Sequence, residues 1–243
     1  MPPVRWRDRP QPIRVAPRAA TDRPLDVIPL GEHLKGRFPA YIDKVRQELR
    51  AIIQDKSQLE NGIRVFTYLD PMAQQAAEQA VLTRLGKLDN NIEAAMVVTD
   101  YQQGALKAIV GGRNTTFAGY NRAISAQRQI GSIIKPVVYL TALMQPSRFH
   151  LGTVLADTPL NLKSGGRNWQ PLNYDKKFRG NVPLIQALSE SLNIPTVRLG
   201  LQLGLPALGQ SLQKLGLARE VKLQPSSLLG AVEMSPLEVA QLY

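Results

Sequence analysis

Apolar and polar positions alternate between helical and strand-like spacing along the first part of the chain. Residues 40–54 carry apolar side chains at helical spacing, which predicts an amphipathic helix. After an Asn-Gly turn, Ile63–Tyr68 is rich in β-branched and aromatic residues and predicts a strand. Asp70 is an N-cap with proline at the first helical position, and it predicts a helix that continues to about Leu88.

The middle of the chain changes from a strand pattern to a helical one. Two short apolar runs, Ala94–Thr99 and Ala105–Val110, flank a glycine-containing turn and predict an antiparallel hairpin. From Gly131 onward the pattern is mostly helical. Loops are expected at residues 158–181 and around three later breakers, which are Pro195, Gly204 and Pro225. The sequence therefore predicts an α/β chain of the α+β type, with a partial antiparallel sheet and a helical cluster.

The last predicted element is a helix that begins at Ser235. Ser235 and Glu238 form a capping box, with proline at the first helical position. The printed sequence stops at Tyr243, roughly two turns later, without a C-cap glycine. This pattern leads us to expect a chain that is cut short.

Composition changes the picture mainly at the N-terminus. The first 24 residues contain six arginines and two acidic residues, and seven of the 18 prolines lie in the first 30 residues. We expect residues 1–36 to be a disordered linker and residues 37–243 to be a domain. The formal net charge of +11 favours an anionic neighbour. Nucleic acid is not the expected partner, because aromatic residues do not interleave with the basic ones as in single-strand binders.

Residue types that are rare or missing restrict the chemistry. The chain has no cysteine, which excludes a disulfide scaffold, a cysteine metal site and a thiol nucleophile. Its two histidines, His33 and His150, are too far apart in sequence for a metal-ligand motif. No apolar run approaches the roughly 18 residues of a membrane helix, and the N-terminus has no signal-peptide core. An enzyme built from this chain would need a base other than histidine.

Ser132 and Lys135 form a Ser-x-x-Lys motif within an apolar run. Residues three apart share one face of a helix, so the hydroxyl and the amine can meet there. Lysine can take the serine proton only if burial lowers its pKa, and the surrounding isoleucines and valines could provide that burial. The alternative is a helix N-cap followed by a lysine whose amine reaches solvent.

Two further motifs need the same comparison. A second Ser-x-x-Lys, at Ser211 and Lys214, lies within an amphipathic helical stretch and is interpreted as structural. Ser191 and Asn193 form the chain's one Ser-x-Asn motif, and Asn193 is expected just past the end of a helix. Taken alone, that asparagine is readily explained as a helix C-cap.

The order of the motifs, and longer blocks around them, carry a resemblance to a known family. Ser-x-x-Lys, Ser-x-Asn and Lys-[Ser/Thr]-Gly are used by penicillin-binding proteins and class A β-lactamases. From about Ala40 to Tyr243 the chain resembles the front part of the transpeptidase domain of bifunctional class A penicillin-binding proteins. The resemblance is carried by five blocks in family order: Phe117–Ala123, Arg128–Leu143, Asn168–Asp175, Ala187–Gly200 and Leu228–Tyr243.

The resemblance implies roles for four residues. Ser132 would attack the penultimate D-alanine carbonyl of a peptidoglycan stem peptide ending in D-Ala-D-Ala, with Lys135 as its base. Ser191 would pass the proton to the leaving D-alanine, and Asn193 would bind the peptide amide of the substrate. β-Lactams would acylate Ser132 as substrate mimics, and no metal or organic cofactor is implied. The resemblance also implies a partner glycosyltransferase domain and a location on the periplasmic face of the inner membrane.

The third family motif does not follow Ser191 in the printed sequence. Lys163-Ser164-Gly165 has the right residues, but it precedes Ser191 in a glycine-rich loop and is rejected as that motif. We therefore expect an incomplete fold whose sheet retains only the strands before Gly111, and a chain that is inactive by itself. The alternatives are a DD-carboxypeptidase or β-lactamase-type acyl hydrolase, a non-catalytic binding remnant and, least favoured, a nucleic-acid binder.

Overall fold

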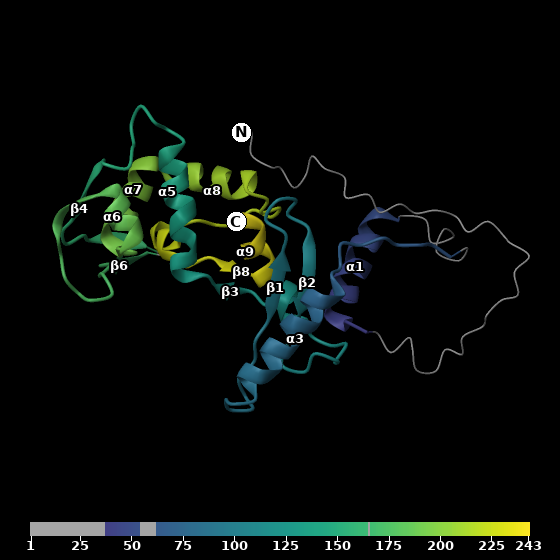
Figure 1. Ribbon diagram of the computed structural model, residues 1–243. Helices are drawn as coiled ribbons and strands as arrows, with labels where there is room; N and C mark the ends of the chain where they lie inside the picture. Colours follow the sequence, from purple (N-terminus) through teal and green to yellow (C-terminus); the bar gives the residue numbers. More distant parts are fainter. Residues whose placement is uncertain (1–36, 54–61, 165) are drawn as a thin grey trace, which may run out of the picture. The chain divides into compact units, whose positions relative to one another are not determined.

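The structure is a computed structural model that describes residues 37–53, 62–164 and 166–243. The predicted linker, residues 1–36, lies outside these ranges. The described chain divides into two compact units (Figure 1). One unit contains the residues up to Ala126 together with Ser235–Ala240, and the other contains Gln127–Met234 and Gln241–Tyr243.

The N-terminal unit is a small three-layered structure around a hairpin. Its elements are α1 (Pro39–Ile52), α3 (Pro71–Leu85), β1 (Met96–Thr99), β2 (Leu106–Val110) and α4 (Arg122–Ser125). β1 and β2 pair antiparallel, with a register shift between Val98 and Thr99, so the predicted hairpin is confirmed.

Side chains of β2 point alternately to opposite faces of the hairpin. Ala108 and Val110 join a cluster with α3, whereas Ile109 between them packs with Tyr41 of α1. This two-residue period places one helix on each face of the hairpin. The buried Gln74 of α3 binds the backbone of Ile109 through both ends of its amide, at 2.8 Å each. The Gln74 side chain thereby pairs with the backbone N–H and C=O of Ile109, as a neighbouring strand would.

Predictions for the first 90 residues were accurate for helices and wrong for one strand. α1 and α3 form as expected, and the Asp70 carboxylate accepts hydrogen bonds from the amides of Met72 and Ala73. α3 ends three residues before the predicted Leu88. Within Ile63–Tyr68, only Ile63 takes part in a β-bridge, and the exposed Phe66 and Tyr68 find no core to cover. β-Propensity alone did not extend this bridge into a strand over residues 64–68.

The second unit combines short strand pairs with a helical cluster. Its helices are α5 (Lys135–Leu143), α6 (Leu184–Ser189), α7 (Asn193–Leu203) and α8 (Leu205–Lys214), with 3₁₀ turns η1 (Gly131–Ile134) and η2 (Pro225–Leu229). Its strands are β3 (Arg128–Gln129), β4 (Val154–Asp157), β5 (Leu162–Ser164), β6 (Arg167–Trp169), β7 (Gly180–Pro183) and β8 (Glu233–Met234). They pair antiparallel as β3 with β8, β4 with β7, and β5 with β6.

These strands correct two sequence-based expectations. Strands are present after Gly111 as well as before it, and the predicted 158–181 loop contains the β5–β6 hairpin. Pro195 does not lie in a loop either, because it occupies the first turn of α7. Proline is tolerated there, since an amide in the first turn has no helical partner. Gly204 does separate α7 from α8, as predicted.

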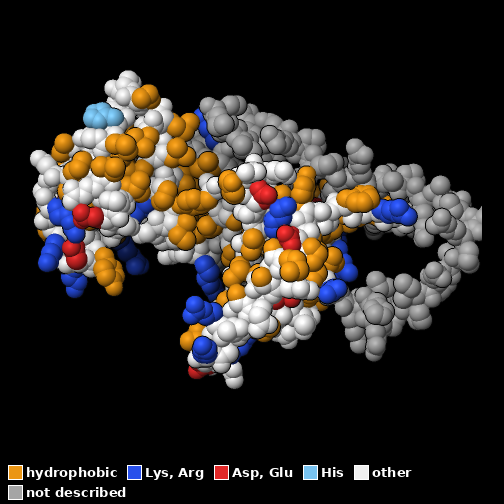
Figure 2. Space-filling view, in the orientation of Figure 1, with side chains coloured by type: hydrophobic (Ala, Val, Ile, Leu, Met, Phe, Trp, Pro, Cys, Tyr) orange, Lys and Arg blue, Asp and Glu red, His pale blue; other side chains and the backbone are white. Residues whose placement is uncertain are grey.

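The helical cluster of this unit packs around α7. α7 contacts α5, α6 and α8, as Figure 1 also shows for the green and teal helices. Val137 and Val138 of α5 are fully buried against this cluster. Figure 2 shows apolar side chains at the surface of this unit as well, and Leu140 and Met144 of the α5 segment are exposed. α5 is thus apolar on more than one face and buries only part of its circumference.

The final helix, α9 (Pro236–Leu242), begins with the predicted capping box. The amide of Ser235 donates to Glu238 Oε2 at 2.8 Å, and the amide of Glu238 donates to Ser235 Oγ at 3.2 Å. The backbone amides of Ser235 and Glu238 are therefore both hydrogen-bonded within the capping box, as the sequence indicated.

Candidate active site

Lys135 is the first residue of α5 and one of the most deeply buried side chains of the structure. Only 1% of its surface is exposed, and Ile134, Val137 and Val138 around it are buried too. Ile133, which we also expected to cover it, points outward and is 47% exposed. Burial lowers the pKa of Lys135 from its ordinary 10.5 to about 8. The sequence-based expectation of a lysine with a depressed pKa is thus met in the structure.

The ammonium group of Lys135 contacts the Ser-x-Asn motif. Its Nζ donates to the carbonyl oxygen of Ser191 at 2.5 Å, to Ser191 Oγ at 3.0 Å and to Asn193 Oδ1 at 2.6 Å. Three acceptors match the three N–H groups of a charged lysine. All three partners are uncharged, so this buried charge is solvated by dipoles rather than by a carboxylate.

Ser191 adopts an unusual backbone conformation that aims it at Lys135. Its φ is +52°, in the left-handed region where glycine is favoured. The amide of Ser191 donates to Leu188 O at 3.0 Å, and the amide of Leu192 donates to Ala187 O at 2.9 Å. These two bonds form a Schellman motif that closes α6, with serine in the position where glycine is usual.

Asn193 lies immediately beyond this turn and is the first residue of α7. The C-cap explanation of Asn193 is therefore wrong, since Ser191 is the residue that closes the preceding helix. Asn193 Nδ2 donates to Leu172 O at 2.7 Å, while its Oδ1 accepts from Lys135. Both ends of the amide are thus used, and the side chain has one defined orientation.

Ser132 lies in η1, one turn before the buried lysine, and is exposed. The amide of Lys135 donates to the carbonyl oxygen of Ser132, which places the two residues on one tight turn. Among the described residues, no hydrogen bond joins Ser132 Oγ to Lys135 Nζ. The structure therefore brings Lys135, Ser191 and Asn193 together and places the exposed Ser132 on the turn that begins α5.

A close approach between two glycines fixes the backbone next to Ser132. The amide of Gly131 donates to Gly230 O at 3.2 Å, which extends the β3–β8 pairing toward η1. A Cβ atom on Gly230 would lie 2.0 Å from Gly131 O and 2.4 Å from Gly131 Cα. No side chain fits there, so the residue at position 230 must be glycine for this turn to form.

Comparison with known proteins identifies the family of this chain. The family described as "Penicillin binding protein transpeptidase domain" matches residues 94–243, which include all four predicted site residues. The chain belongs to the penicillin-binding protein transpeptidase family. The resemblance noted from the sequence blocks is confirmed.

Relatives within this transpeptidase family cover nearly the whole chain. The chain is 45% identical to penicillin-binding protein 1B of Vibrio cholerae over 230 residues, which are 92% of this chain and 30% of the relative. It is 43% identical to penicillin-binding protein 1B of Escherichia coli K12, over 91% of this chain and 27% of the relative. The chain thus spans about 30% of the length of these relatives.

A solved structure supports the transpeptidase fold. The PonA1 protein of Mycobacterium tuberculosis in complex with penicillin V aligns with a TM-score of 0.70 and 27% sequence identity. The alignment covers 83% of this chain and 57% of that one. The mixed helix and strand content predicted from the sequence is therefore that of a penicillin-binding transpeptidase fold.

Within the described part of the chain, the two rejected motif matches make no hydrogen bond with Ser132, Lys135, Ser191 or Asn193. Ser211 is buried, and its hydroxyl is hydrogen-bonded to Thr141 at 2.8 Å, while Lys214 is exposed at the end of α8. Lys163 and Ser164 lie on β5, which is paired only with the neighbouring β6 within the described residues. Both are structural features, although Lys163 lies on a strand rather than in the expected loop.

Sequence reasoning missed the contribution of residues 172 and 173. Leu172 O and Asn173 Oδ1 both bind Asn193, through its side chain and its backbone amide respectively. The available signal is the Asn168–Asp175 block, which carries part of the family resemblance but no motif of its own. No spacing rule connects it with a motif 20 residues away.

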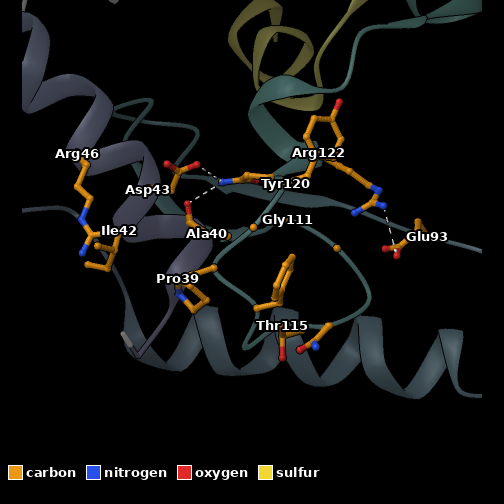
Figure 3. A pocket seen from close by; sticks show the side chains of 16 residues that line it. Pro39, Ala40, Ile42, Asp43, Arg46, Glu93, Gly111, Thr115, Tyr120 and Arg122 are labelled. Carbon is orange, nitrogen blue, oxygen red and sulfur yellow. Dashed lines mark hydrogen bonds and ion pairs between the residues drawn. The ribbon is translucent and has the colours of Figure 1, made fainter. Parts of the chain in front are cut away.

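The N-terminal unit contains a separate cavity of about 470 Å³, between α1 and residues 111–122 (Figure 3). The Asn121 amide closes one side by donating to Ala40 O and Asp43 Oδ2, and Arg122 pairs with Glu93 at 3.4 Å. The four predicted site residues are not among its lining residues.

The described residues contain no group of three or more His, Asp or Glu side chains placed to hold a metal ion. None of the helices in the described ranges is both long enough and apolar enough to cross a membrane.

Proposed function

We propose that this chain supplies the acylation machinery of a peptidoglycan DD-transpeptidase, with Ser132 as the nucleophile. The observation that supports this most directly is the contact of buried Lys135 with both Ser191 Oγ and Asn193 Oδ1. Ser191 and Asn193 lie 56 and 58 positions after Lys135 in the sequence, yet both side chains contact its amine. The exposed Ser132 belongs to the same motif as Lys135. Any buried ammonium needs acceptors, so what favours a catalytic role is that two of these acceptors are the side chains of the Ser-x-Asn motif.

The proposed reaction proceeds through an acyl-enzyme. Ser132 Oγ attacks the carbonyl of the penultimate D-alanine while Lys135 Nζ takes its proton. The C–N bond to the terminal D-alanine then breaks, and Ser191 Oγ passes a proton from Lys135 to the leaving amine. An amine of a neighbouring stem peptide attacks the Ser132 ester and regenerates the serine, which yields a crosslink. The second N–H of Asn193 Nδ2, not the one that binds Leu172 O, donates to the carbonyl oxygen of the substrate amide.

Lys135 must be neutral to act as this base. With three acceptors bound, the charged lysine has no lone pair to offer Ser132. With its pKa at about 8, roughly a tenth of Lys135 is neutral at pH 7. Tyr139 of the same helix stays neutral throughout this range, because burial raises its pKa to about 12.

The rate of Ser132 acylation is expected to follow the ionisation of Lys135. Between pH 7 and pH 9 the rate constant for acylation by a penicillin should rise about tenfold and then level off, as the neutral fraction saturates. The measurement is the appearance of covalent adduct by intact-mass spectrometry, corrected for spontaneous β-lactam hydrolysis at each pH. A rate that is constant or falls across this range would contradict the assignment of Lys135 as the base.

The nucleophile is tested with a fluorescent penicillin under prolonged incubation. We expect one adduct, located at Ser132 by peptide mapping, that is lost in Ser132→Ala and kept in Ser211→Ala, the matched serine of the rejected motif. Labelling should be slow, since the printed sequence has no Lys-[Ser/Thr]-Gly after Ser191 and one oxyanion-hole donor is worth about 10²–10³ in rate. Such an adduct would overturn the expectation that the chain is inactive by itself. Labelling that survives in Ser132→Ala, or its absence in the wild-type chain, would overturn the proposal.

The same proposal places the chain beside a wall polymer. In it, the chain works on the periplasmic face of the inner membrane, next to the glycosyltransferase domain of its parent protein, on stem peptides that end in D-Ala-D-Ala. The net charge of +11 suits a neighbourhood of anionic lipid and wall polymer. If the acyl-enzyme is released only by water and never by a stem-peptide amine, the carboxypeptidase alternative replaces the transpeptidase.

A further inference from the structure

A buried carboxylate–amide pair lies directly behind the Ser-x-Asn motif. Asp157, at the end of β4, is completely buried, and Asn173 is 3% exposed. Asn173 Nδ2 lies 2.8 Å from Asp157 Oδ1 and 2.9 Å from Oδ2, and it donates to Lys177 O at 2.8 Å. The amide group of Asn173 is therefore held from one side by three acceptors, which leaves its carbonyl oxygen pointing the other way.

That carbonyl oxygen binds the start of α7. Asn173 Oδ1 accepts from the amide of Asn193 at 2.8 Å and from the amide of Ile194 at 3.3 Å. These are the first two amides of α7, which have no partner within the helix. The N-cap residue, Leu192, has no side-chain oxygen to offer, so a residue 20 positions upstream performs the capping.

Asn193 is held at two points by one short segment. Asn173 Oδ1 fixes its backbone amide, and Leu172 O accepts from its side chain at 2.7 Å. The opposite end of the same side chain accepts from Lys135 at 2.6 Å. A shift of residues 172–173 would therefore move the Asn193 side-chain amide, which accepts a hydrogen bond from Lys135.

An ion pair between Arg179 and Glu190 connects the other side of the Ser191 turn to Asp157. Arg179 Nε lies 2.9 Å from Glu190 Oε2, one residue before Ser191. The backbone amide of Arg179 donates to Asp157 Oδ2 at 2.9 Å. Asp157 thus connects to both flanks of the turn, although the Arg179–Glu190 pair is partly exposed and contributes little by itself. The buried Asp157–Asn173 pair is the principal connection.

We propose that Asn173, oriented by Asp157, is a positioning residue that fixes the Ser-x-Asn motif against Lys135 for the acylation of Ser132. This inference rests on the proposed function and adds two residues to it. The left-handed backbone of Ser191 is a conformation that needs support from its surroundings. Asn173 supplies that support one residue beyond the strained turn, where both the helix start and the Asn193 side chain can be held.

The first test separates positioning from general stability. In Asn173→Ala we expect acylation of Ser132 by penicillin to slow about 10–100-fold, as for a displaced reacting group. The pKa of Lys135, followed by NMR in chain carrying ¹³C-labelled lysine, should move upward from about 8 as the loosened site admits water. Asn181→Ala, an exposed asparagine of β7, is the matched control and should change neither value. The NMR measurement holds even if the wild-type chain is never acylated, so failure of the proposed function can be distinguished.

The second test exchanges the two side chains. Asn173→Asp alone sets two carboxylates against each other and should lose acylation as strongly as Asn173→Ala. The double variant Asp157→Asn with Asn173→Asp restores one donor and one carboxylate, and a carboxylate suits the first amides of a helix. On a logarithmic scale, we expect the double variant to recover at least a third of the loss in acylation rate that Asn173→Asp shows relative to the wild-type chain. The pKa of Lys135 should also return toward its wild-type value. A fall in the free energy of unfolding in Asn173→Ala, with the Lys135 pKa unmoved, would overturn the positioning role, as would a double variant no better than Asn173→Asp.

Discussion

Replacing Gly230 with alanine is expected to remove about 3–5 kcal/mol from the free energy of unfolding. The new Cβ would lie 2.0 Å from Gly131 O, a backbone atom that cannot move without moving η1. Gly230 also has a φ of +85°, where an L-residue is strained by roughly 1–2 kcal/mol. The backbone on both sides would have to separate, and Ser132 is the residue next to the contact. Urea unfolding followed by circular dichroism measures the loss.

A second glycine of the same unit serves as the control for that substitution. Gly209 lies within α8, and a Cβ there would meet Leu223 Cδ1 at 3.5 Å, an ordinary contact. Gly209→Ala should therefore raise the free energy of unfolding by about 0.5–1 kcal/mol, because alanine is the better helix former. If Gly230→Ala is as stable as Gly209→Ala, the close approach of Gly131 and Gly230 is not part of the folded protein.

Replacing Lys135 with methionine should reduce acylation of Ser132 about 10²–10⁴-fold, the usual contribution of a general base. Methionine keeps an unbranched apolar stem of similar length, so the packing against Val137 and Val138 is retained. Lys214→Met, in the rejected motif, alters an exposed lysine at the same motif position and should leave the acylation rate unchanged. Equal rates in the two variants would remove Lys135 from the mechanism.

The same variant isolates the effect of Lys135 on stability. The pKa of Lys135 is about 8 in the folded chain and 10.5 for an ordinary lysine, so between these values the unfolded chain binds more protons. The stability of the wild-type chain relative to Lys135→Met should therefore rise with pH from about 8 to 10.5, by about 3 kcal/mol, and stay flat below pH 8. Urea titrations of both proteins at several pH values give this difference, in which the other lysines and tyrosines cancel.

Local signals explain what could be predicted from the sequence. The Asp70 cap, the hairpin around residues 100–104 and the Ser235 capping box each depend on residues within a few positions of one another, and each is present in the structure. Ser132 and Lys135 belong to the same class, since their spacing places them on one turn. Such features depend on backbone geometry more than on the rest of the fold.

The features that could not be predicted depend on contacts between distant segments. β3 and β8 are two residues long each and lie more than 100 positions apart, too short for a pattern to reveal them. At residues 63–68 strand propensity was a poor guide, because its effect depends on how the side chains pack against their neighbours. In the candidate site, the resemblance singled out Ser191 and Asn193, but the capping of α7 by Asn173 could be found only from the three-dimensional fold.

The backbone of Ser191 has a consequence for how this protein can change over time. Glycine is the residue that its left-handed position favours energetically, and a substitution to glycine would relax the turn. The same substitution would remove the hydroxyl 3.0 Å from Lys135. Under the proposed mechanism, selection for a more stable fold and selection for crosslinking therefore favour different residues at this one position. In a descendant that no longer catalyses the reaction, substitution of position 191 by glycine should be among the first changes. Glycine at this position would therefore indicate a family member that has lost its activity.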